Sequence, residues 1–182
     1  MLVFIGSAII LLVMPQYFIS VIGASRASTG EIQLAEEVGR ELADKSAVLI
    51  CGGLNGIMEA ACRGAVNAGG MTVGILPTEY RENANKYVKI PIVTGMGHGR
   101  NMIVAKSGQA VIAIGGGYGT LSEIAYACQA GIPVIGLKTW VLSKDEELNK
   151  SILQASNAKE AVGLAIHSII KVNNKYKKGK EW

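Results

Sequence analysis

The sequence predicts a three-layer α/β/α domain with a Rossmann-like, mainly parallel sheet of about six or seven strands. Short apolar runs rich in Val and Ile alternate with longer segments in which apolar residues recur at helical spacing, the pattern of repeated strand–helix–strand units. Hydrophobic residues make up 49% and aromatic residues 5% of the 182 residues, with 23 glycines, which suits a core of small aliphatic side chains crossed by tight turns. At this length we expect one domain, over residues 14–171.

The first half of the domain is expected to begin with a strand that ends in the turn Gly23-Ala24-Ser25. Ser28 followed by Glu31 is the capping-box pattern of a helix start, so a helix should follow that turn. The strands predicted in this half are residues 18–22, 47–51 and 71–75, and a second helix is predicted at 56–67.

The second half opens with a polar stretch at 77–87, for which we predict a mobile loop over a binding site. The run at 110–114 is apolar throughout, as expected for a central strand that is buried on both faces. Asn157 with Glu160 predicts a capping box at the start of the last helix. The remaining elements predicted here are strands at 88–93 and 132–137, an edge strand at 152–153, and helices at 100–107 and 120–129.

The two ends of the chain differ in composition from the domain between them. Residues 1–13 are an apolar run that is too short to span a bilayer. We interpret them as an extension upstream of an initiator at Met14, with an interfacial anchor as the alternative. Residues 172–182 form a basic tail. Together with the preceding Lys171 they carry five lysines against Glu181, which leaves 13 basic and 13 acidic residues elsewhere out of totals of 18 and 14. We expect a solvated terminus, with nucleic-acid contact as the alternative, and predict no nucleic-acid or membrane partner.

The cysteines and histidines give no pattern of a disulfide framework or a metal site. The three cysteines, Cys51, Cys62 and Cys128, include no CxxC pair, and there are only two histidines. We therefore predict a cytoplasmic protein with buried free thiols and no metal site.

Two glycine-rich loops follow predicted strands and are the strongest candidates for a ligand site. Residues 115–119 are four glycines and Tyr118 between an apolar strand and a helix start, where free N–H groups and the helix dipole favour an anion, and residues 52–56 occupy the same place after an earlier strand. A tight turn without a ligand is the alternative for either loop. Neither loop has the Lys-Ser/Thr pair of a P-loop, and the first strand lacks the dinucleotide fingerprint. The candidate ligand-binding residues at these strand ends are Gly23, Ser25, Gly52, Gly53, Asn55, Gly116, Gly117, Tyr118, Gly119 and Thr120.

The segment 116–123, Gly-Gly-Tyr-Gly-Thr-Leu-Ser-Glu, resembles the GGxGTxxE motif of the LOG family, once described as possible lysine decarboxylases. The resemblance covers residues 18–137 and implies that Arg100 and Glu123 are catalytic. Asn101 stands where that family usually has a lysine, and Gly115 where it usually has a proline. These departures resemble the branch that contains molybdenum cofactor carrier proteins. The family commonly forms dimers or larger assemblies, so we expect a homodimer or homotetramer.

The resemblance implies hydrolysis of the N-glycosidic bond of a nucleoside 5′-monophosphate, with Glu123 orienting the ribose or activating water and Arg100 binding phosphate or ribose. No cofactor is required for that reaction. The alternatives are a non-catalytic carrier or sensor that binds a nucleotide, phosphate or molybdenum cofactor, and an Arg100–Glu123 ion pair that only joins two helix starts. Pyridoxal-dependent decarboxylation is disfavoured because no lysine lies near either loop in the sequence. His98 and Tyr118 are interpreted either as ligand contacts or as exposed loop residues.

Overall fold

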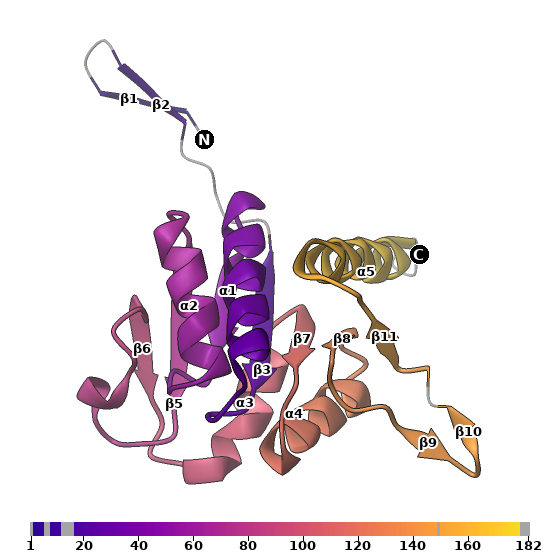
Figure 1. Ribbon diagram of the computed structural model, residues 1–182. Helices are drawn as coiled ribbons and strands as arrows, with labels where there is room; N and C mark the ends of the chain where they lie inside the picture. The colour runs from indigo at the N-terminus through magenta and orange to yellow at the C-terminus, as the bar shows by residue number, and fades with distance from the viewer. Residues whose placement is uncertain (1, 6–7, 12–16, 149, 179–182) are drawn as a thin grey trace.

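The computed structural model describes residues 2–5, 8–11, 17–148 and 150–178. Seven parallel strands form the main sheet in the order β11-β8-β7-β3-β4-β5-β6, which confirms the predicted α/β fold (Figure 1). The strands of this sheet are β3 (Phe18–Gly23), β4 (Val48–Cys51), β5 (Met71–Leu76), β6 (Ile90–Val93), β7 (Ala110–Ile114), β8 (Val134–Leu137) and β11 (Ile152–Gln154).

Helices cover both faces of the sheet and give the domain its three layers (Figure 1). Residues of α1, α2 and α5 belong to the larger apolar cluster on one face, and residues of α3 and α4 to the smaller cluster on the other. All five residues of β7 are buried, as predicted for a central strand. The helices are α1 (Thr29–Asp44), α2 (Ile57–Asn67), α3 (Asn101–Ser107), α4 (Tyr118–Gln129) and α5 (Ala158–Lys178).

The order of the strands reverses beside β3. From β3 the chain adds β4, β5 and β6 on one side, and then returns to place β7 and β8 on the other side. In an open parallel sheet the carboxyl ends of the strands at such a switch point diverge and leave a crevice for a ligand. The loops that follow β3, β4 and β7 therefore converge at one edge of the sheet.

The helix starts agree with the sequence in α1 and differ in part in α5. At α1 the Ser28 side chain accepts from the Glu31 N–H, and the Glu31 carboxylate accepts from the Ser28 N–H, so the predicted capping box is confirmed. At α5 the Asn157 Oδ1 accepts from the Glu160 N–H at 2.9 Å, but the Glu160 carboxylate accepts from the N–H of Ser156 instead of Asn157. The reciprocal half of the predicted box therefore lies one residue earlier.

Several element boundaries differ from the sequence prediction. A 3-10 turn, η2 (Gly97–Arg100), precedes α3, and α4 begins at Tyr118, two residues before the predicted start. The polar stretch at 77–87 contains a second 3-10 turn, η1 (Arg81–Asn83). A small antiparallel pair, β9 (Ser143–Lys144) with β10 (Glu147–Leu148), was not predicted.

The predicted terminal segments are described only in part. Within the predicted extension, β1 (Leu2–Ile5) pairs with β2 (Ala8–Leu11) as a separate antiparallel sheet, and residues 1, 6–7 and 12–13 lie outside the described ones. α5 continues to Lys178, through most of the predicted basic tail, and residues 179–182 lie outside the described part. None of the helices in the described ranges combines the length and apolar character needed to cross a membrane.

Candidate functional site

A pocket of about 300 Å³ opens at the edge of the sheet where the strand order reverses. Such a volume lies at the small end of the range, roughly 300–1,000 Å³, that is typical of small-molecule sites. The predicted site residues that line it are Gly23, Ser25, Arg100, Gly117, Gly119, Thr120 and Glu123. The other lining residues are Ala24, Leu54, Met58, His98 and Asn101.

One wall of the pocket is the N-terminus of α4. Gly116 has a φ of +105°, and a Cβ added there would lie 2.5 Å from the Thr120 side chain, so only glycine lets the loop turn this tightly into the helix. The first N–H groups of a helix have no partner within the helix and carry its positive dipole end. Gly117, Gly119 and Thr120 line the pocket, so this positive end of the helix faces it.

Arg100 and Glu123 form a buried ion pair in the same pocket. Arg100 ends η2 and Glu123 lies in α4, and the Arg100 Nη1 donates to Glu123 Oε1 at 3.1 Å. Both side chains are 8% exposed. Burial raises the pKa of Glu123 from 4.5 to about 7, although the charge and hydrogen bond of Arg100 act to lower it. This carboxyl group can therefore gain or lose a proton near neutral pH.

Asn101 and Gly52 also lie beside the guanidinium of Arg100. The Nη1 also donates to Asn101 Oδ1 at 2.9 Å, and a Cβ added to Gly52 would lie 2.4 Å from Nη2. Gly52 thus serves the site by leaving space for Arg100, although it does not line the pocket. The Nε of Arg100 is buried and has no hydrogen-bond partner within the described part of the chain. Buried polar groups usually have a hydrogen-bond partner, so this unpaired donor is an exception.

The loop after β4 is held by a residue from the 77–87 stretch. The buried Asn85 donates from Nδ2 to the carbonyl oxygens of Gly53 at 3.2 Å and Leu54 at 2.9 Å, and its own N–H donates to Gly53 O at 2.9 Å. No residue of 77–87 lines the pocket, so this stretch fixes the neighbouring loop instead of covering the site as predicted. Asn55, a predicted ligand contact, is exposed and outside the pocket.

Tyr118 lies on the outer side of its glycine loop. Its side chain is exposed, and its ring centroid is 5.9 Å from that of Trp140. The Trp140 Nε1 donates to the Gly117 carbonyl at 3.3 Å. Tyr118 does not line the pocket, whereas His98, which is also exposed, does.

None of the three cysteines lines the pocket. Cys51 and Cys62 are buried with their sulfur atoms 3.5 Å apart, and Cys51 Sγ accepts from the Gly53 N–H. The described ranges contain no group of three or more His, Cys, Asp or Glu side chains that could hold a metal ion.

Sequence reasoning did not identify Leu54, Met58 or Asn101 as site residues. Asn101 directly follows Arg100 and replaces a lysine of the LOG pattern, which was a signal that could have pointed to it. Leu54 and Met58 are ordinary apolar residues after the Gly52-Gly53 pair, and only the fold turns them toward the pocket.

Comparisons with known proteins identify the family and agree with the fold. The profile of the SLOG cluster4 family matches residues 16–164. An uncharacterised protein of Archaeoglobus fulgidus is 41% identical over 84% of this chain and 97% of that protein. The cytokinin riboside 5′-monophosphate phosphoribohydrolase of Rhodococcoides fascians is 32% identical over 66% of this chain and 63% of that enzyme.

Two solved structures resemble the chain over nearly their whole lengths. The molybdenum cofactor binding protein of Rippkaea orientalis is 35% identical, with a TM-score of 0.77 over 87% of this chain and 99% of that one. The molybdenum cofactor carrier protein of Chlamydomonas reinhardtii is 29% identical, with a TM-score of 0.73 over 86% and 99%. The family match, the LOG-type motifs and these neighbours together show that the chain belongs to the LOG-like SLOG cluster4 family.

Proposed function

We propose that the pocket binds a nucleoside 5′-monophosphate and that the protein hydrolyses its N-glycosidic bond, giving the free base and ribose 5-phosphate. The observation that carries this proposal is the buried Arg100–Glu123 pair, which lines the same pocket as the N-terminus of α4. An anion site and a carboxyl group that titrates near neutral pH are the two features that such a reaction needs.

The phosphate is assigned to the start of α4. The N–H groups of that helix start provide hydrogen bonds and a positive dipole, and the Thr120 hydroxyl adds a donor. Arg100 is always charged and contributes a planar set of donors to phosphate or to the ribose hydroxyls. The apolar side chains of Leu54 and Met58 form the pocket wall that suits a flat base.

Glu123 is assigned to the bond-breaking step. As the C1′–N bond breaks, its electron pair leaves with the base and the sugar acquires oxocarbenium character, which a nearby carboxylate stabilises. One water molecule is consumed: its hydroxyl group bonds to C1′ and its proton passes to the base, with Glu123 as the group that accepts the proton from water. Because the pKa of Glu123 is about 7, the carboxylate form becomes the major one above that pH.

The second candidate function is a carrier that binds molybdenum cofactor without turnover. It is favoured by the two solved structures, which match this chain over almost their full lengths, and by Asn101 in place of the LOG-type lysine. The same anion site would hold the phosphate of the cofactor's pterin part. In this case the cofactor is the cargo.

We further propose that the protein is a cytoplasmic homodimer or homotetramer, with a small phosphorylated molecule as ligand and no nucleic-acid or membrane partner. The support for assembly is an apolar surface on β5 and the edge strand β6, where Met71, Ile90 and Ile92 are between 42% and 47% exposed. The register of β5 against β6 directs these side chains to one face of the sheet. Multi-angle light scattering on the purified protein tests this; a monomer at micromolar concentration contradicts it.

The experiment that tests the activity is incubation of the purified protein with a panel of nucleoside 5′-monophosphates, followed by chromatography of free base. Base release that is lost in Glu123→Gln supports the hydrolase. Absence of release from every monophosphate, together with binding of molybdenum cofactor, supports the carrier instead.

A further inference from the structure

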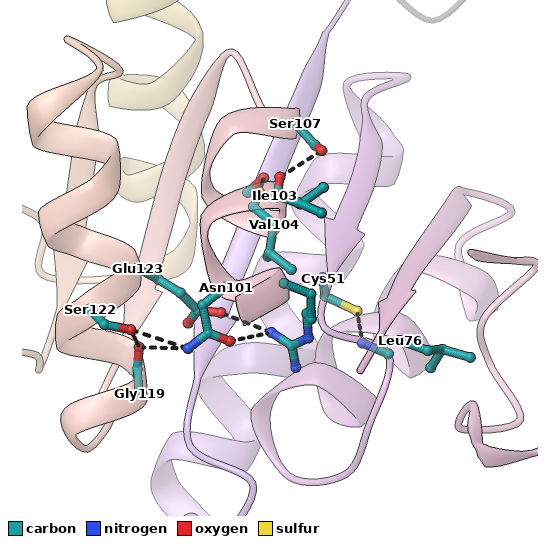
Figure 2. A network of polar contacts seen from close by, with 12 residues as sticks. Cys51, Leu76, Asn101, Ile103, Val104, Ser107, Gly119, Ser122 and Glu123 are labelled. Carbon is teal, nitrogen blue, oxygen red and sulfur yellow. Dashed lines mark hydrogen bonds and ion pairs between the residues drawn. The ribbon is translucent and has the colours of Figure 1, made fainter. Parts of the chain in front are cut away.

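Asn101 makes polar contacts from both halves of its side-chain amide. Its Oδ1 accepts from Arg100 Nη1 at 2.9 Å. Its Nδ2 donates to Ser122 Oγ at 3.1 Å and lies 3.5 Å from the carbonyl oxygen of Gly119 (Figure 2). The residue is 8% exposed. A single buried side chain therefore links Arg100 at the end of η2 to the first turn of α4.

These contacts require an amide. A guanidinium only donates and a carbonyl only accepts, so the partners fix which end of the amide faces which element. Lysine, the residue of the LOG-type pattern, has donors and no acceptor. At position 101 it would deprive Arg100 of one acceptor and place a second positive charge beside it.

We propose that Asn101 is a positioning residue that fixes the Arg100 guanidinium to the first turn of α4, so that an anion bound at that helix start also meets Arg100. The ligand part of this inference rests on the proposed function, because it takes the ligand's phosphate to lie at α4. The restraint on Arg100 does not depend on any ligand.

The surroundings of Arg100 explain why one contact matters. Nη1 is shared between Asn101 Oδ1 and Glu123 Oε1, and Nε has no partner among the residues that the structure describes. Without Asn101, the hydrogen bonds within the described part of the chain leave the guanidinium attached through Glu123 alone. A single hydrogen bond allows the group to pivot, whereas two acceptors on different elements fix its plane.

The direct test is ¹⁵N NMR of the Arg100 side chain in the ligand-free protein, which reports rotation about the Nε–Cζ bond. In Asn101→Leu, of similar size, we expect this rotation to become roughly tenfold faster, the scale expected for losing one hydrogen bond to a charged group. Ser122→Ala leaves the Arg100 contact intact and should change the rate by less than about threefold. Rotation in Asn101→Leu as slow as in the native protein overturns the proposal.

A control separates positioning from a general loss of stability. Thr72 in β5 is fully buried, and its hydroxyl donates to Tyr87 O and accepts from the Lys89 N–H, away from the pocket. Thr72→Val should lower the free energy of unfolding but leave the rotation of Arg100 unchanged. Faster rotation in this variant as well would show that the NMR signal reports stability, and would also overturn the proposal.

Binding of inorganic phosphate, measured by calorimetry, tests the ligand part. We expect the dissociation constant to rise roughly tenfold in Asn101→Leu and to stay unchanged in Thr72→Val. Equal affinity in native protein and Asn101→Leu overturns the ligand part. If the native protein binds neither phosphate nor any nucleoside 5′-monophosphate while Arg100 is restrained by Asn101 in the NMR test, the proposed function fails and the positioning role stands.

Discussion

Replacing Glu123 by Gln should make the folded protein more stable at neutral and higher pH. The folded state holds the Glu123 proton more tightly than the unfolded chain, because burial raises the pKa of this group from 4.5 to about 7. Its contribution to stability is therefore fully present below pH 4.5 and is lost as the pH rises to 7 and beyond. Gln resembles the protonated acid in shape and charge and does not titrate.

The magnitude follows from the two pKa values. The difference between 4.5 and about 7, at about 1.4 kcal/mol per pH unit, corresponds to roughly 3 kcal/mol. We expect the free energies of unfolding of Glu123→Gln and the native protein to be nearly equal at pH 4.5. At pH 8 the variant should be more stable by an amount of that order.

Urea denaturation at pH values from 4.5 to 8 measures this difference, provided that both proteins unfold with the same dependence on urea. Glu36→Gln is the matched control, because hydrogen bonds from Arg63 lower the pKa of Glu36. Glu36 therefore contributes stability above pH 4.5 that is lost as the pH falls, so its variant should be less stable at pH 8. A Glu123→Gln variant with no gain at pH 8, or with a difference that does not depend on pH, would refute the reasoning.

Three other substitutions or modifications test the surroundings of the site. Gly52→Ala should weaken phosphate binding at least severalfold in calorimetry, because the new Cβ would lie 2.4 Å from Arg100 Nη2. Gly30→Ala is the control, because Gly30 in α1 has open space around it, and it should leave binding unchanged. Equal effects of the two substitutions would contradict this prediction. Asn85→Leu should lower the free energy of unfolding by about 1–3 kcal/mol in urea, because it removes the side-chain donor to the Leu54 carbonyl and one of the two donors to the Gly53 carbonyl; an unchanged midpoint would contradict the role of that contact. Iodoacetamide with mass spectrometry should label Cys128, which is partly exposed, before the other two cysteines, which are fully buried and should react only on unfolding.

The regular elements were predictable because each has a local cause. The apolar run 110–114 is buried on every residue, as a central parallel strand should be, and the Ser28–Glu31 capping box is present as the sequence indicates. The start of β6 was not predictable from its apolar run, which predicts a strand from residue 88. The Thr72 hydroxyl donates to the carbonyl of Tyr87, and β6 begins only at Ile90.

The sequence predicted the part of the candidate site that consists of glycine-rich loops and the charged residues beside them. Arg100, Glu123 and Thr120 lie in one pocket because parallel strands bring their loops to one edge of the sheet. The direction of a loop side chain is set by its neighbours, and this is why Tyr118 lies beside Trp140 and Asn55 lies in solvent. The role of Asn85 depends on contacts about 30 residues away in sequence, which no local pattern reveals.

The measurement that tests the central claim most directly is release of free base from nucleoside 5′-monophosphates across pH 5–9, by the native protein and by Glu123→Gln. The proposed function predicts release by the native protein that increases as the pH passes through about 7, and loss of release in the variant at every pH. Release by Glu123→Gln at the native rate, or no release from any monophosphate by the native protein, would contradict it.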